Sequence, residues 1–241
     1  SIAFLAPYLE EAFQSENLSY RLEFEDTILT WAGWKQSLDI LVTNAHVIGP
    51  DGSTLATIPE TSLGLSAFAL LKGQVKPTSV ELLRPTVHLM RDLQGQFKLA
   101  FGKDPKEPNK VINNLAADFL SVHETGHPLE ELKRISILAA SLNVEDESLG
   151  LSWHSLEADL IFEVSDQGID GDLIANIQID EAAFKVLAAT SFERDSGKVE
   201  TKLRIGEVVP ADLAGLSPNF AAFEGLDLPI SGDLEFTLDR G

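Results

Sequence analysis

The residues with the clearest catalytic spacing in this sequence are His123-Glu124-Thr125-Gly126-His127. On a helix, an H-E-x-x-H segment places two imidazoles on one face as zinc ligands, with a glutamate beside them as general base. Here Pro128 directly follows the second histidine and disfavours helical backbone there, because its ring collides with the preceding residue. We therefore expect a loop between a helix and a strand, with no bound metal and no catalytic residue. A zinc hydrolase remains a remote alternative.

Two weaker patterns have plainer explanations. The segment from Asp166 to Asp172 holds three aspartates and two glycines, as a calcium loop does, but its spacing differs and the bidentate glutamate is missing. It is predicted to be a loop between two strands. Trp31, Trp34 and Trp153 lie near the ends of expected strands, where large aromatic residues usually serve as packing anchors. No phosphate-binding loop, dinucleotide fingerprint or nucleophile elbow occurs, so we expect no cofactor and no enzymatic activity.

The elements that would position any site are mainly strands. Apolar and polar residues alternate in three segments before residue 102, which is the pattern of a half-buried sheet. The apolar members are Val80 and Leu82, then Val87 and Leu89, then Phe97, Leu99 and Phe101. A short helix is predicted over Ala67–Leu71, and a short strand from Leu55 is expected to end at Pro59.

The alternation returns after Ile135 and continues to the end of the chain. Because side chains two residues apart on a strand point the same way, each alternating set shares one face. We expect the apolar faces to turn inward and line an elongated groove. The predicted lining residues are Leu22, Phe24, Leu156, Leu160, Phe162, Leu173, Ile177 and Leu203. The pattern leaves open whether this face stays open or is closed as a dry core.

Residues 102–133 interrupt the strand pattern with prolines, charges and asparagines, and are predicted to be a linker with short helices. They separate a first β module, residues 1–101 with a short N-terminal helix, from a second, residues 134–241. The second module is expected to end inside a longer β pattern. The predicted fold class is therefore mainly β, with two curved antiparallel β-sheet modules of a β-groove or taco-like form and a few short helices.

The charge of the chain restricts its partners. It has 18 lysines and arginines against 38 aspartates and glutamates, a formal net charge of −20. Nucleic-acid binding is not expected, because phosphate backbones are bound by basic residues, and neither is a broad basic patch on anionic lipid headgroups. The chain has no cysteine, so disulfides say nothing about its compartment.

Several phrases of the sequence occur in a recognisable order. In the first half they are DTILTWAGW (26–34), LDILVTNAHV (38–47), IPETSLGLSAFALLKG (58–73) and LLRPTVHLMRDLQGQF (82–97). In the second half they are LKRISI (132–137), ASLNVED (140–146), GLSW (150–153) and LPISGDL (228–234). Together they resemble the AsmA-like superfamily of Gram-negative envelope proteins, and within it the YhdP-like branch.

This resemblance implies a function. Such proteins are anchored in the inner membrane by one N-terminal helix and extend a periplasmic β-groove, which carries phospholipid toward the outer membrane. The chain would be a periplasmic lipid-binding or lipid-conducting segment that lacks the anchoring helix. Its partners would be phospholipid or another acyl-chain ligand, the inner membrane and other envelope proteins. The family has no catalytic residues to carry over. The alternative is a structural or interaction β-domain of an envelope protein with no lipid cavity.

Overall fold

The computed structural model of the chain describes residues 21–23, 26–31, 38–48, 54–72, 74, 76–101, 130–179 and 182–238. Most of these residues lie in strands, and the helices among them are short, as the sequence predicted. The strands are β1 (Arg21–Glu23), β2 (Asp26–Trp31), β3 (Leu38–Ile48), β4 (Thr54–Leu65), β5 (Pro77–Leu83), β6 (Thr86–Arg91), β7 (Phe97–Phe101), β8 (Arg134–Asp146), β9 (Leu151–Val164), β10 (Gly168–Ile179), β11 (Ala182–Glu193), β12 (Val199–Val208) and β13 (Ile230–Leu238). The helices are α2 (Ala67–Leu71), α4 (Pro210–Ala214) and the 3₁₀-helix η1 (Pro218–Phe223).

The chain divides into two compact units. The first contains Ser1–Thr86 and Leu99–Leu138, and the second contains Val87–Lys98 and Ala139–Gly241. All the strand pairs belong to one hydrogen-bonded sheet, so the two separate sheets expected from the sequence are not confirmed.

The first unit is organised around β3. This strand pairs antiparallel with β1, β2 and β4, and β4 pairs antiparallel with β5. The unit's core is formed by the buried residues Ile40, Val42, Ala45, Ile58, Leu63 and Leu65. β5 also pairs with the beginning of β8 in parallel, from Ser79 opposite Arg134 to Leu83 opposite Leu138. This parallel pair was not expected from the antiparallel pattern of the sequence.

Pro59 does not end a strand, although the sequence predicted that it would. It lies inside β4, which continues to Leu65. The ladder between β4 and β5 begins at Glu60, so at Pro59 the strand has no partner on that side among the described residues. A proline without a backbone N–H is tolerated where no ladder hydrogen bond is required. α2 occupies its predicted residues and is capped at its N-terminus by Ser66, whose Oγ accepts a hydrogen bond from the N–H of Ala69 at 3.3 Å.

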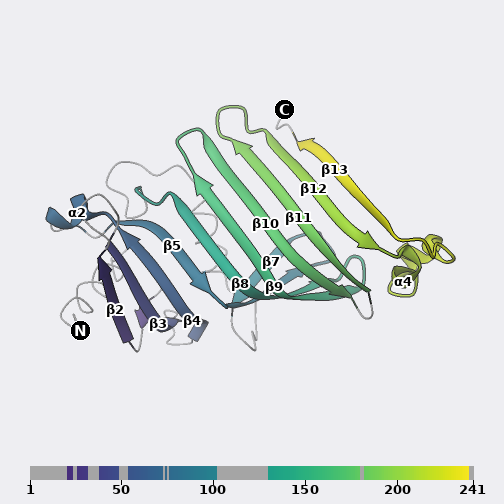
Figure 1. Cartoon of the computed structure of the whole chain (residues 1–241), viewed down its shortest axis with the longest axis horizontal. Helices are drawn as coiled ribbons and strands as arrows, with labels where there is room; N and C mark the ends of the chain where they lie inside the picture. The colour runs from purple at the N-terminus through teal and green to yellow at the C-terminus, as the bar shows by residue number, and fades with distance from the viewer. Residues whose placement is uncertain are drawn as a thin grey trace. The chain divides into compact units, whose positions relative to one another are not determined.

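The second unit is a meander. Strands β9 to β13 pair antiparallel with their neighbours in chain order and lie side by side in Figure 1, with α4 at one end of β12 and β13. The segment that precedes β13 holds the two short helices α4 and η1. β10 begins at Gly168, so most of the predicted loop from Asp166 to Asp172 is strand.

Candidate functional site

One face of the second unit carries apolar residues in register across β9 to β13. The clearest row consists of residues directly opposite one another on successive strands. It contains Leu160, Leu173, Ala188, Leu203 and Leu234. The rows beside it are Phe162, Gly171, Thr190, Thr201 and Phe236, then Ala158, Ala175, Val186, Ile205 and Gly232. A fourth row contains Val164, Ile169, Phe192, Val199 and Leu238. We call these four rows the apolar face.

The residues of the apolar face are all uncharged. Its two threonines, Thr190 and Thr201, hydrogen-bond each other through their hydroxyls at 3.1 Å. In this cross-strand pair one threonine hydroxyl donates to the other. The apolar face therefore contributes hydrocarbon surface and no ionic group.

The opposite side of the same strands carries all their charged residues, together with Ile161, Ile174 and Leu187. Asp170, Asp172 and Asn176 alternate with the apolar residues of β10 and face solvent. Between β12 and β13, Arg204 contacts Asp233 at 2.6 Å and Lys202 contacts Glu235 at 3.4 Å. The charged residues of these strands are thus confined to one side of the sheet, because side chains alternate between the two faces.

Burial on the apolar face decreases toward β13. Ala158 and Ala175 are 0% and 1% exposed, whereas Leu160, Leu173 and Leu203 are half-buried. On β13, Leu234 is 54% exposed and Leu238 is 62% exposed. A soluble sheet normally covers such a face with a second layer. Among the described residues, no such layer covers β13, where every residue is exposed.

The register brings five of the predicted lining residues onto one face: Leu160, Phe162, Leu173, Ile177 and Leu203. That they bind lipid remains a prediction. Leu22 lies on β1 in the other unit, opposite Val47, and Phe24 lies outside the described residues.

The expectation that Leu156 shares a face with Leu160 is wrong. Ala175 pairs with Ala158, but the next same-face residue, Ile177, pairs with Ser155. Leu156 and Glu157 therefore both stand opposite Asn176, which is a β-bulge. The extra residue breaks the alternation, and Leu156 is 74% exposed. A hollow of about 360 Å³ lies beside this bulge, lined in part by Leu156, Asn176 and Phe184.

The sequence analysis left out three residues of the apolar face. Leu234, Phe236 and Leu238 extend the rows onto β13 and were not among the predicted lining residues. The signal was present, because these residues alternate with Asp233, Glu235 and Thr237. What the sequence lacked was the pairing of β13 with β12, which places the three residues beside Leu203, Thr201 and Val199.

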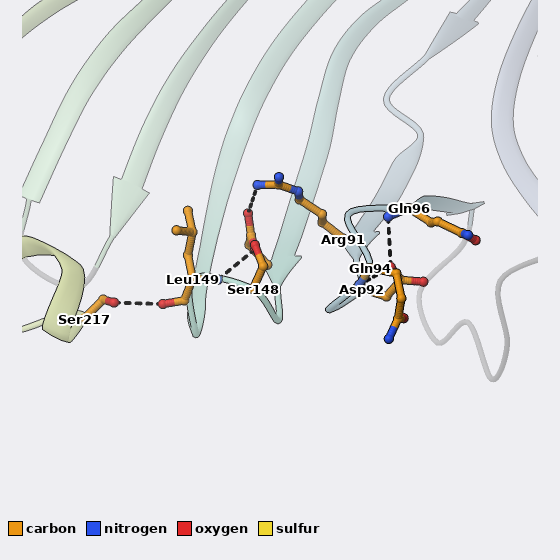
Figure 2. A network of polar contacts seen from close by, with 8 residues as sticks. Arg91, Asp92, Gln94, Gln96, Ser148, Leu149 and Ser217 are labelled. Carbon is orange, nitrogen blue, oxygen red and sulfur yellow. Dashed lines mark hydrogen bonds and ion pairs between the residues drawn. The ribbon is translucent and has the colours of Figure 1, made fainter.

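A polar network holds the turn between β8 and β9, as Figure 2 shows. Asp146 accepts hydrogen bonds from Ser148 Oγ at 2.6 Å, from the N–H of Leu149 at 3.0 Å and from Arg91 at 3.2 Å. The Ser148 hydroxyl, followed by the Leu149 amide and the Arg91 guanidinium, holds the pKa of the Asp146 carboxyl below its usual value. The buried hydroxyl of Ser217 donates to the carbonyl of Leu149 at 2.8 Å, which fixes the segment before η1 to the same turn. The network positions turns and holds no reactive group.

The other chemical candidates do not form a site in the described part of the chain. His123 and His127 lie outside the described residues, and so does Trp34. Asp170 and Asp172 point from the polar side of β10 and do not form a calcium loop. Among the described residues, no group of three His, Cys, Asp or Glu side chains could hold a metal ion.

Comparison with known proteins adds no relative. No protein-family model, no curated protein and no solved structure matches this chain. In the described part of the chain, no helix has both the length and the apolar character needed to cross a membrane. The apolar face is therefore the observation from which a function can be argued.

Proposed function

We propose that the apolar face binds the acyl chains of phospholipid. On this proposal the chain is a periplasmic segment of an AsmA-like, YhdP-like envelope protein that moves phospholipid between the inner and outer membranes. The observation that carries the proposal is the row Leu160, Leu173, Ala188, Leu203 and Leu234, which crosses five strands and is only partly covered. The resemblance of the sequence to that family supports the envelope location.

The physical argument is that such a face needs an apolar occupant. Monomeric soluble proteins rarely leave a large contiguous apolar patch in water. An acyl chain that leaves water gains about 0.8 kcal/mol per buried CH₂ group. A chain of ordinary length would therefore be held by its hydrocarbon alone. Because the residues of the face are uncharged, the headgroup would remain at its margin or in solvent.

The test compares two neighbouring residues on opposite sides of β9. Leu160 belongs to the apolar face, and Ile161 pairs with Asp172 on the polar side. We expect lipid to be extracted from the purified wild type and from Ile161→Glu, and to be lost from Leu160→Glu while its circular dichroism stays that of a folded sheet. A carboxylate at an open face reaches water, whereas one in a closed core lacks a partner and unfolds the protein.

The competing function is a structural or interaction β-domain with a dry core. It is favoured by the near-complete burial of Ala158 and Ala175 on the first two strands of the face. It predicts that Leu160→Glu unfolds the protein and that the wild type carries no lipid. A second test, in cell envelopes, measures the crosslinking of lipid to photoreactive side chains at positions 160 and 177, with position 157 as the control. Equal labelling of the three positions by lipid would refute the lipid-binding proposal.

A further inference from the structure

The apolar face contains one pair of side chains that can form hydrogen bonds. Thr190 and Thr201 lie directly opposite each other on β11 and β12, and they alone among the residues of the four rows have a polar atom in the side chain. Their hydroxyls are 3.1 Å apart. Both side chains are half-buried, so the pair belongs to the surface that a ligand of the face would cover.

The pair has one hydroxyl hydrogen that the bond between the two threonines does not use. Each threonine has one O–H donor, and one of these two donors is engaged in the mutual bond. Among the described residues, neither hydroxyl has a second hydrogen-bond partner. Water can accept the remaining hydrogen while the face is uncovered. A hydrocarbon chain laid over the pair would leave this donor unsatisfied, which weakens binding unless the ligand brings an acceptor.

We propose that the Thr190–Thr201 pair binds the ester carbonyl of a glycerolipid, so that the apolar face selects ester-linked lipid. This inference rests on the proposed function, because it concerns the ligand of the same face. The ester carbonyl is the hydrogen-bond acceptor that lies between the acyl chain and the headgroup of such a lipid. It is uncharged, as the residues of the face are, so its burial requires a hydrogen bond and no counter-ion.

The position of the pair on the face fits this role. Along β9 the rows follow one another at Ala158, Leu160, Phe162 and Val164, and the pair belongs to the row of Phe162. Only the row of Val164 separates it from the turn between β9 and β10. Successive rows are two residues apart, which is about 7 Å along a strand. With the acyl chains over the rows of Leu160 and Ala158, the headgroup reaches the margin of the face beyond Val164.

The residues that border the pair on its own strands are apolar. They are Ala188 and Phe192 on β11, and Val199 and Leu203 on β12. A ligand that lies over them excludes water from the hydroxyls, and a hydrogen bond is electrostatically stronger in such surroundings. The same surroundings make an unmatched hydroxyl hydrogen more costly, which is the physical basis of the selection.

The test compares two lipids that differ only in the ester carbonyls. They are a short-chain diacyl phosphatidylcholine and the dialkyl ether of equal chain length, each below its critical micelle concentration. Calorimetric titration of the full chain measures the two dissociation constants. The ester should bind more tightly by about two- to tenfold, the range that one net hydrogen bond supplies. Hydrocarbon burial alone predicts equal binding or tighter binding of the ether, because the ether lacks the polar carbonyls.

Substitutions at the pair assign the preference to its hydroxyls. Replacing both threonines by valine keeps the β-branched shape and removes both partners of the bond, so the protein should stay folded. This double variant should bind the ether at least as tightly as the ester. Replacing both by serine keeps the hydroxyls and should keep the ester preference. The matched control Thr237→Val changes an exposed threonine that pairs with Glu200 on the charged side, and should leave the preference unchanged.

The results that would overturn the inference differ from those that would overturn lipid binding. Equal binding of ester and ether by the wild type would overturn the contact with the carbonyl and leave the lipid-binding proposal standing. So would an ester preference that persists in the double valine variant. Binding of neither lipid by the wild type would refute both proposals.

Discussion

Gly168 is the position at which the structure predicts the largest effect from the smallest change. A Cβ at this residue would overlap the carbonyl oxygen of Phe192 on β11 and lie 3.0 Å from its carbonyl carbon. Both atoms are backbone, so relief requires the two strands to separate. Gly168 is the first residue of β10 and is bonded to the turn that precedes the strand. Its N–H donates to Ser165 Oγ at 3.2 Å, and its carbonyl accepts from the N–H of Ser165 at 2.9 Å.

The cost of Gly168→Ala can be estimated from these contacts. Overpacking in a rigid environment costs about 1–3 kcal/mol. Displacing the residue weakens one or two hydrogen bonds that contribute about 1 kcal/mol each. Alanine also reduces the conformational entropy of the unfolded chain, which offsets about 0.4–1 kcal/mol of this cost. We therefore expect the free energy of unfolding to fall by about 2–4 kcal/mol, measured as a lower urea midpoint with an unchanged slope.

The matched control is Gly215→Ala, at the end of α4. Its φ is −79° and a Cβ there would meet nothing within 4 Å. This variant should be as stable as the wild type or up to about 1 kcal/mol more stable. If Gly168→Ala proves as stable as Gly215→Ala, the close approach of β10 to β11 at Phe192 is wrong, and so is the register of these strands.

Two further outcomes follow from the sequence and the polar network. Asp146→Asn should lower the free energy of unfolding by about 1–2 kcal/mol at neutral pH. Because the folded pKa of Asp146 lies below its unfolded value of 3.8, the wild type should lose this advantage as the pH falls through the lowered pKa. Urea unfolding of both proteins from pH 7 to pH 2 should show the difference in their free energies of unfolding shrinking in acid, and a constant difference would contradict the network. The loop expected around Pro128 predicts that the chain holds no stoichiometric zinc. Replacing His123 and His127 by alanine should leave the free energy of unfolding within about 0.5 kcal/mol of the wild-type value. Elemental analysis that finds one zinc per chain would contradict this prediction.

The strands were predictable because the alternation that marks them is local. β5, β6, β7 and most of the second unit were predicted from this pattern, since a strand with one covered face must repeat apolar residues at every second position. α2 was predictable for the same reason, as its boundaries depend on a short apolar run and on the residues beside it. None of these elements required knowledge of a distant partner.

The features that were missed depend on pairing between distant residues. The parallel contact of β5 with β8 joins segments about fifty residues apart, and no local pattern records it. The bulge that removes Leu156 from the apolar face is visible only when β9 is aligned with β10. The prediction that a strand ends at Pro59 fails because the sequence does not show on which side β4 lacks a partner at that residue. The sequence therefore predicted which residues of one strand share a face. It did not predict which residues of neighbouring strands lie opposite one another, and this register is what forms the rows of the apolar face.

The meander of the second unit has a consequence for how it opens. From β9 to β13, each strand pairs with the strand before and after it in the chain. A sheet of this kind is nearly one-dimensional, and its stability is approximately a sum of terms between adjacent strands. Among the described residues, β13 has one neighbouring strand and no buried residue, so it should detach first, followed by β12. Amide hydrogen exchange should accordingly slow strand by strand from β13 toward β10, because each opening must release the strands outside it.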